Sequence, residues 1–172
     1  MVLEIFVLSI LRTGPVHGYE LKRRVLRPSL TPLSNNSLYP MLRRFEADGL
    51  VTKTVEEQAG KPSRNVYEIT DAGRERLRGQ LLSLPPDLAS SEEEFLVRVS
   101  FFHEIPEANR RAIIGARESA LLAERAQVAE LLDETTPSPK TAWRTKVMTR
   151  VLEDLDSERD WIAQLTTQDG NS

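Results

Sequence analysis

The sequence contains no cysteine and only two histidines among its 172 residues. The lack of cysteine excludes disulfide bonds and thiolate metal sites. No apolar run approaches the roughly 18 residues of a membrane-spanning helix, and no signal-peptide pattern is present. A phosphate-binding loop and a dinucleotide-binding glycine fingerprint are also absent. We therefore expect a cytoplasmic protein that is not an enzyme, needs no membrane and holds neither a metal nor another cofactor.

What the sequence does have is an uneven distribution of charge. Hydrophobic residues make up 40% and charged residues 28% of the chain, as in soluble globular proteins. The net charge is −3, yet residues 1–83 carry 13 Lys and Arg against 9 Asp and Glu. Residues 84–172 carry 10 against 17. A basic first half and an acidic second half indicate that the first half meets a polyanion.

Residues 34–46 predict a short helix that is presented to a nucleic acid. Small polar side chains crowd its first turn, where unpaired backbone N–H groups and the helix dipole favour anions. Leu38, Leu42 and Phe45 recur at helical spacing and are expected to anchor one side to a core. Pro40 falls about one turn into the helix, where its missing N–H costs little. Taken alone, an ordinary capped surface helix explains this stretch equally well.

Two helices are predicted before it. Residues 2–12 are apolar on several sides, which is typical of a buried helix, and Gly14-Pro15 ends them. His17, which follows, is expected to be a turn residue rather than a catalytic base. Gly18 begins a second helix whose outward face carries four cations, which could contact phosphate or simply be solvated. These cations are Lys22, Arg23, Arg24 and Arg27.

A hairpin and a fourth helix are predicted after it. Residues 50–56 and 65–70 alternate like two strands, and residues 58–64 form a turn with a basic tip. Thr70 can cap a fourth helix that runs to about residue 82. Three helices followed by a basic-tipped hairpin are the order of a winged helix-turn-helix, in which the third helix enters the major groove.

The residue types on these segments suit DNA. Asn pairs bidentately with adenine, Ser and Tyr bond to bases or phosphates, and Lys and Arg contact phosphates. The expected DNA-binding residues are Ser34, Asn35, Asn36, Ser37, Tyr39, Arg43, Lys61, Arg64 and Lys22.

Three segments, spread over roughly residues 3–80, resemble the PadR family of transcriptional regulators. The motif of residues 17–21 is similar to the start of the family's second helix, and residues 34–42 are similar to its recognition helix. Residues 60–73 are similar to its wing and following helix. The family usually has Gly where this chain has Asn36, and tends to be basic where it has Ser63 and Asn65. The resemblance implies a DNA-binding regulator, more commonly a repressor.

The second half of the chain predicts long helices. Pro85-Pro86 marks a boundary, and Ser90 with Glu93 forms a capping box for a helix. Pro106 opens a helix to about residue 133, and Ser138-Pro139 begins a last one. Their long apolar stripes exceed what one small domain covers, so that a second copy or the first domain is expected to cover them. The resemblance favours dimerisation.

Aromatic residues in this half could line a pocket for a small-molecule effector. The expected effector-binding residues are Phe102, His103 and Trp143. Aromatic residues at helical spacing are also common in cores, so an ordinary core is the alternative.

Together these patterns predict a mainly α fold with a β wing. Residues 1–83 form a winged helix-turn-helix domain, 84–90 a linker, 91–167 an antiparallel long-helix dimerisation domain and 168–172 a disordered tail. The expected function is a transcriptional regulator that binds a pseudo-palindromic site on double-stranded DNA as a homodimer, and a small-molecule effector is expected to be able to release it. The alternative is a winged-helix module that binds proteins and lacks sequence-specific DNA binding.

Overall fold

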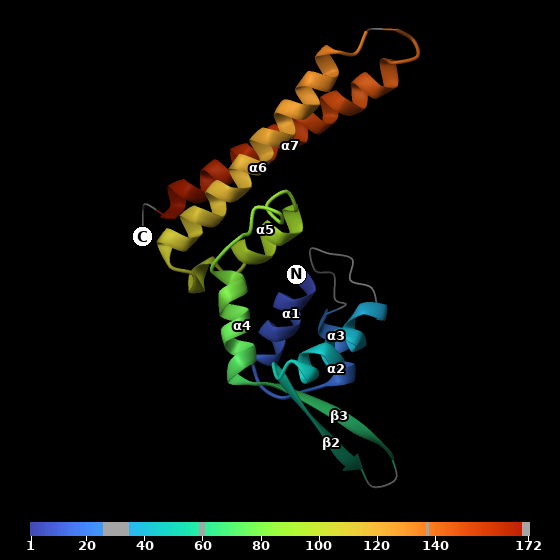
Figure 1. Cartoon of the computed structure of the whole chain (residues 1–172), viewed down its shortest axis with the longest axis vertical. Coiled ribbons are helices and arrows are strands. Elements are labelled where there is room, and N and C mark those ends of the chain that lie inside the picture. Colours follow the sequence, from blue (N-terminus) through green and yellow to red (C-terminus); the bar gives the residue numbers. More distant parts are fainter. Residues whose placement is uncertain (26–34, 59–60, 137, 170–172) are drawn as a thin grey trace. The chain divides into compact units, whose positions relative to one another are not determined.

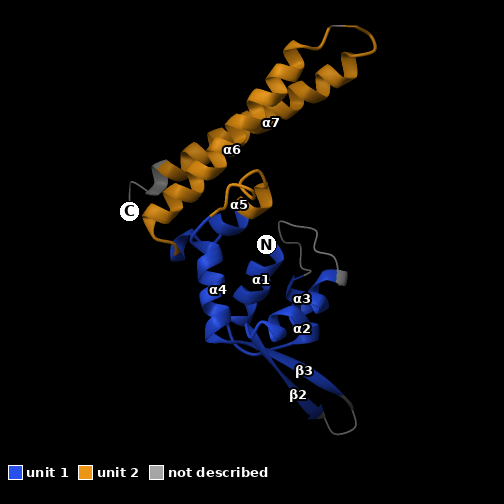
Figure 2. Cartoon of the chain, in the orientation of Figure 1, with its two compact units in different colours: residues 1–83, 96–104 blue, residues 84–95, 105–172 orange. Residues whose placement is uncertain are grey.

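A computed structural model of the chain describes residues 1–25, 35–58, 61–136 and 138–169 (Figure 1). The chain divides into two compact units (Figure 2). Unit 1 comprises residues 1–83 and 96–104, and unit 2 comprises residues 84–95 and 105–172. The predicted linker at 84–90 thus groups with unit 2, and residues 96–104 group with unit 1. The assignment of a DNA-binding domain and a dimerisation domain stays a prediction.

Unit 1 is a winged helix built around its first helix, and the fold class that the sequence predicts is confirmed. Its helices are α1 (Val2–Leu11), α2 (Gly18–Val25), α3 (Asn35–Ala47) and α4 (Asp71–Leu81). Helix α1 contacts α2, α4 and strand β3 (Lys61–Ile69), which is why it is apolar on more than one side. The buried core includes Ile5, Leu8 and Leu11 of α1 together with Leu21 and Leu77.

The sheet has three antiparallel strands in the order β1-β3-β2, where β1 is Val16–His17 and β2 is Val51–Gln58. The prediction of a turn at His17 was wrong, because His17 lies in β1 opposite Val66. The predicted turn over residues 58–64 was too long, because Arg64 lies within β3 opposite Glu56. His17 and Arg64 lie in strands because of strand pairing. A two-residue strand and the polar end of a strand show no alternation of apolar and polar residues that would reveal them in the sequence.

The connection between the β2–β3 hairpin and α4 is tightly packed. Thr70 caps α4 as predicted: its hydroxyl accepts a hydrogen bond from the Gly73 N–H at 3.1 Å and donates one to the Gly49 carbonyl at 2.7 Å. A Cβ atom at Gly73 would overlap the Leu50 carbonyl oxygen and approach Cγ1 of Ile69 to 2.7 Å. Glycine is therefore required there for α4 to pack against the start of β2.

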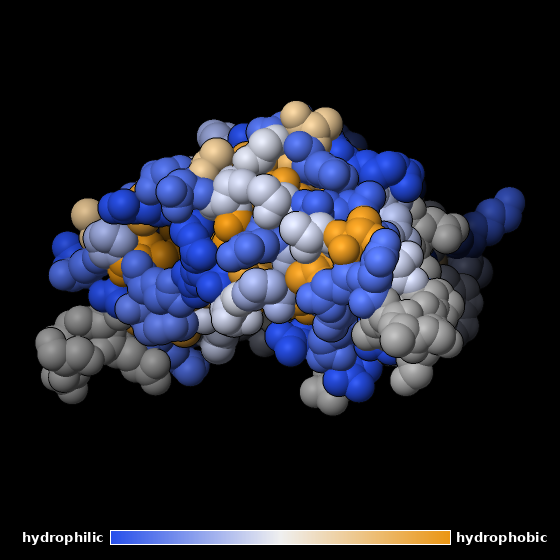
Figure 3. All heavy atoms as spheres, turned by 90° about the horizontal axis from the view of Figure 1, so that it is seen from below, coloured by the Kyte–Doolittle hydropathy of each residue, from blue (hydrophilic) through white to orange (hydrophobic). Residues whose placement is uncertain are grey.

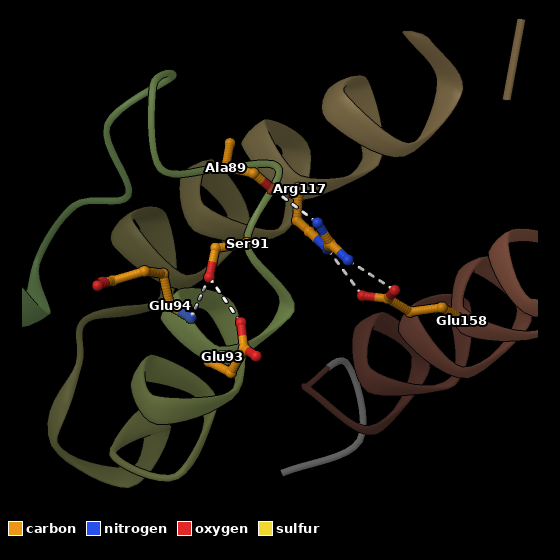
Figure 4. Close-up of polar contacts among 6 residues, drawn as sticks. All are labelled: Ala89, Ser91, Glu93, Glu94, Arg117 and Glu158. Carbon is orange, nitrogen blue, oxygen red and sulfur yellow. Dashed lines mark hydrogen bonds and ion pairs between the residues drawn. The ribbon is translucent and has the colours of Figure 1, made fainter. Parts of the chain in front are cut away.

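Helix α5 (Glu92–Val99) begins in unit 2 and ends in unit 1. Its cap is Ser91 rather than the predicted Ser90: the Ser91 hydroxyl accepts from the Glu94 N–H at 3.2 Å and donates to the Glu93 carboxylate at 2.9 Å (Figure 4). The acidic run follows the cap into the first turn, where the helix dipole favours negative charge. A short 3-10 helix, η1 (Phe102–Glu104), comes next and contains Phe102 and His103.

Unit 2 is dominated by α6 (Glu107–Asp133) and α7 (Ala142–Asp169), which lie side by side as a hairpin (Figures 1 and 2). Pro106 precedes α6 as predicted. Helix α7 begins at Ala142 and not at Pro139, because Ser138 and Thr141 first form a turn in which the Thr141 N–H donates to the Ser138 hydroxyl at 3.3 Å. Residues 168–169 of the predicted tail belong to α7, and residues 170–172 lie outside the described residues.

The apolar stripes of the hairpin are buried only in part. Helix residues Ile113, Ile114, Leu121, Leu155 and Ile162 are buried. Towards the α6–α7 connection Met148 is buried, but several of the described large apolar side chains are exposed; these are Leu122, Leu131, Trp143 and Val147. Within the described ranges, no helix combines the length and the apolar character that crossing a membrane requires.

Candidate nucleic-acid interface

Helix α3 has one buried and one exposed side. Leu38, Leu42 and Phe45 are each at most 3% exposed, which confirms that they anchor the helix to the core. Ser37, Tyr39 and Arg43 are exposed. The three described members of the predicted DNA-binding set on this helix therefore have side chains that a ligand can reach.

A concavity of about 570 Å³ lies between α2, α3 and the wing strand β3. It brings together Tyr39 and Arg64, which the sequence placed in the DNA-binding set, although 25 positions separate them. It also includes residues outside that set. Its lining consists of His17, Gly18, Tyr19, Glu20 and Arg23 from β1 and α2, Tyr39 from α3, and Ser63, Arg64, Asn65 and Tyr67 from β3.

The floor of this concavity depends on two residues. The Tyr67 ring is buried, and a Cβ atom at Gly18 would come within 3.1 Å of it, so glycine allows the start of α2 to approach the ring closely. Burial raises the pKa of the Tyr67 phenol, and the charge of the Glu46 carboxylate raises it further. The neutral hydroxyl form of Tyr67 is therefore stabilised in the concavity that Tyr39 also lines.

The cations of α2 are less available to bind phosphate than their number in the sequence indicates. Glu20 accepts a hydrogen bond from Arg24 at 2.8 Å and forms an ion pair with Arg23 at 2.7 Å. The hydrogen bond from Arg24, with help from Arg23, lowers the pKa of Glu20, so its carboxylate stays charged. Lys22 is half-buried. Arg27 lies outside the described residues.

Arg44 of α3 also forms an ion pair, with Glu4 of α1. Its neighbour Arg43 is exposed. The Glu4 carboxylate of α1 accepts a hydrogen bond from Arg44, and it accepts another from Gln80 of α4 at 2.6 Å. Arg76 of α4 lies 3.8 Å from the same carboxylate. Glu4 thereby ties α3 and α4 to α1 and fixes the orientation of the exposed side of α3.

The wing presents polar side chains beside α3. Arg64 is exposed, and its strand partner Glu56 lies 3.9 Å from the His17 imidazole. On the side from which the hairpin projects, the residues drawn in colour are largely hydrophilic, with hydrophobic residues in small separate patches (Figure 3). Ser34 and the side chains of Asn35, Asn36 and Lys61, which the sequence also placed in the DNA-binding set, lie outside what the structure describes.

The DNA-binding set expected from the sequence does not include Tyr19 and Glu20, whereas Arg23 is among the cations of the second helix that were expected to contact phosphate or to be solvated. Tyr19 and Glu20 belong to the motif of residues 17–21, which by itself predicts only a helix start. The pairing of β1 with β3 brings that start of α2 beside Arg64.

The residues predicted to bind an effector belong to different units. Phe102 is half-buried in η1, and His103 is exposed, with its ring nitrogen 3.2 Å from the Glu104 carboxylate. Trp143, in unit 2, is 75% exposed, and the Lys146 ammonium lies 4.6 Å from its ring centroid. An effector site at these residues stays a prediction.

Comparison with known proteins identifies the family. Residues 7–79 match the model of the transcriptional regulator PadR-like family. The negative transcriptional regulator PadR of Bacillus subtilis (strain 168) is 24% identical over 102 residues, which are 58% of this chain and 56% of that protein. The chain therefore spans little more than half the length of this relative.

Two solved structures are similar as well. Bacillus subtilis PadR in complex with operator DNA is 19% identical, with a TM-score of 0.47 over 97% of each chain. A PadR-like transcriptional regulator from Bacillus cereus strain ATCC 14579 is 36% identical, with a TM-score of 0.40, over 45% of this chain and 76% of that one. Residues 7–79 of the chain therefore match the PadR-like family of transcriptional regulators.

Proposed function

We propose that this protein is a transcriptional repressor that binds a pseudo-palindromic operator as a homodimer. The observation that carries the proposal is the concavity of unit 1, where Tyr39 of α3 and Arg64 of the wing line one polar surface. This is the placement that a winged helix needs in order to read the major groove with α3 while its wing contacts the backbone. The relative from Bacillus subtilis is a negative regulator, which favours repression over activation.

The roles of the residues follow from their chemistry. Tyr39 and Ser37 on the exposed side of α3 can hydrogen-bond to base edges or phosphates, and Arg43 and Arg64 can neutralise phosphates. The network around Glu4 holds α3 in a fixed orientation, so its side chains meet the groove without first being ordered. We include Asn35, Asn36 and Lys61 in the proposed interface because of their residue type and position.

A second copy of the chain is the proposed partner of unit 2. Four large apolar side chains are exposed on the half of the α6–α7 hairpin near its connection, including Trp143 and Val147 at 75% and 62%. Burying such a stripe against an identical one is the usual reason for helical hairpins to dimerise. A dimer would set two recognition helices on half-sites about 34 Å apart.

A small-molecule effector would act through this dimer. A ligand that binds more tightly to one dimer geometry than to another shifts the population towards that geometry and so releases or strengthens DNA binding. Phe102 and His103 of unit 1 and, separately, Trp143 of unit 2 are proposed as contacts for such a ligand.

Gel-shift titration against the DNA upstream of the protein's own gene tests the function. A shift at physiological salt that is stronger for this DNA than for a shuffled duplex, and that weakens as salt rises, is expected. If both duplexes bind equally, or neither binds, the proposal fails and the protein-binding winged-helix module becomes the better explanation.

Sedimentation equilibrium tests the dimer. Val147→Glu places a charge in the exposed apolar patch and is expected to shift the protein towards monomer. Thr149→Glu introduces the same charge at another exposed position of α7 and is the matched control. A wild-type protein that stays monomeric at micromolar concentration would exclude the proposed dimer.

A further inference from the structure

Glu20 is the one acidic residue among the described residues that line the concavity. A carboxylate at a surface proposed to meet DNA repels the phosphodiester backbone, so its presence there calls for a physical reason. Its side chain is 26% exposed and therefore stays in contact with solvent.

The two arginines that Glu20 holds are more exposed than Glu20 itself, at 59% for Arg23 and 45% for Arg24. Both lie within one turn of it on α2, so one carboxylate engages two guanidinium groups, and the trio carries a net charge of +1. Arg23 also lines the concavity beside Tyr39 and Arg64. Without Glu20, both guanidinium groups could reach a phosphate, because arginine forms bidentate bonds with phosphate as readily as with carboxylate.

We propose that Glu20 is a specificity-determining residue, which rests on the DNA-binding function proposed above. By holding Arg23 and Arg24, Glu20 weakens the attraction of this surface for phosphates of any sequence. Phosphate contacts supply nearly all non-specific affinity, whereas base contacts distinguish the operator. Weakening the phosphate contacts without changing the base contacts widens the difference in affinity between the operator and other DNA.

Replacement of Glu20 by Gln in the full-length chain tests this, with affinities measured across a salt series for an operator duplex and a shuffled duplex. Affinity for the shuffled duplex is expected to rise about three- to tenfold. The slope of log affinity against log salt is expected to steepen by about one to two units, since each newly contacted phosphate adds about 0.9. Affinity for the operator duplex is expected to rise less, so the ratio of operator affinity to shuffled-duplex affinity falls.

Glu107→Gln is the matched control, because Glu107 pairs with Arg111 across one turn of α6 just as Glu20 pairs with Arg24 across one turn of α2. It changes the net charge by the same amount and is expected to leave the ratio and the salt slope as in the wild type. A purely structural role for Glu20 would lower the melting temperature and weaken binding to both duplexes, which is opposite to the proposal.

A second variant removes all three charges, so that no unpaired carboxylate is left at the surface. In Glu20→Gln/Arg23→Gln/Arg24→Gln the salt slope is expected to stay near the wild-type value, because Glu20 already keeps both arginines from phosphate in the wild type. A slope that flattens by about two units would show both contacting phosphate in the wild type and would overturn the proposal. Selective wild-type binding with an unchanged slope in Glu20→Gln overturns this inference alone, whereas a wild type that binds neither duplex overturns the DNA-binding function as well.

Discussion

Arg117 of α6 and Glu158 of α7 form a bidentate ion pair inside unit 2 (Figure 4). Two guanidinium nitrogens each donate to one carboxylate oxygen at 2.7 Å, and the third donates to the Ala89 carbonyl at 2.9 Å. Arg117 is 3% exposed. One side chain therefore ties α6 to α7 and to the segment before α5, and fixes the register of the two long helices.

Removal of Arg117 is expected to destabilise unit 2 strongly. Arg117→Ala leaves the Glu158 carboxylate without its partner in a largely buried place, which costs about 3–5 kcal/mol. Arg111→Ala removes an exposed arginine from the same helix and is expected to cost less than about 1 kcal/mol. Urea denaturation followed by helical circular dichroism measures both. Equal losses in the free energy of unfolding for the two substitutions would mean that the Arg117–Glu158 ion pair makes no specific contribution to stability.

Two glycines of α4 are expected to respond in opposite ways to alanine. Gly73→Ala forces a Cβ atom against the Leu50 carbonyl and is expected to destabilise unit 1 by about 1–3 kcal/mol. A Cβ at Gly79 meets nothing within 4 Å, so Gly79→Ala is expected to stabilise the helix by up to about 1 kcal/mol. Thermal melting of both variants checks the pair, and a stable Gly73→Ala protein would show that α4 is not held tightly against β2.

Tyr39 is expected to contribute to sequence discrimination. Loss of one base contact costs about 1–3 kcal/mol, so Tyr39→Ala should weaken operator binding by that amount and narrow the gap to single-base operator variants. Tyr39→Phe keeps the ring and removes the hydroxyl, which separates stacking from hydrogen bonding. The affinities come from titration of a panel of operator duplexes. Equal weakening on every duplex would instead assign Tyr39 to the DNA backbone.

The ion pair of Arg12 with Glu104 predicts an acid-sensitive contribution to stability. Arg12 donates hydrogen bonds to Glu104 at 2.5 and 2.8 Å, which lowers the pKa of Glu104. A carboxylate whose pKa is lower in the folded than in the unfolded state stabilises the fold above its unfolded pKa and loses that effect as pH falls through its folded pKa.

Because both side chains are partly exposed, the effect is expected to stay within about 1 kcal/mol. The free energy of unfolding should be higher for wild type than for Glu104→Gln at pH 7 and equal for both well below the pKa of Glu104. Glu75→Gln, at an exposed position of α4, is the control. A difference that persists unchanged at low pH would exclude the carboxylate as its source.

Much of unit 1 follows from local patterns. The apolar positions of α3 follow helical periodicity, α1 is apolar on several sides and is ended by Gly14-Pro15, and Thr70 marks the start of α4, so these elements were predicted close to their observed bounds. The elements that were missed depend on partners distant in sequence. Strand β1 exists because it pairs with β3. The cap of α5 differs for a local reason: the Ser91 hydroxyl accepts from the Glu94 N–H, so the helix starts one residue later than the capping-box pattern indicates.

The sequence by itself determined the winged-helix order, the buried side of α3 and the long helices of unit 2, because periodicity, turn residues and caps act over a few neighbouring positions. The pairing of Glu20 with Arg23 and Arg24 also follows from spacings of three and four residues on one helix. Only the tertiary structure decided which distant charges meet: Glu4 engages Arg44, and Glu158 engages Arg117. The sequence counts all of these arginines as cations, but an ion pair forms only where folding brings the two side chains within a few ångströms of each other.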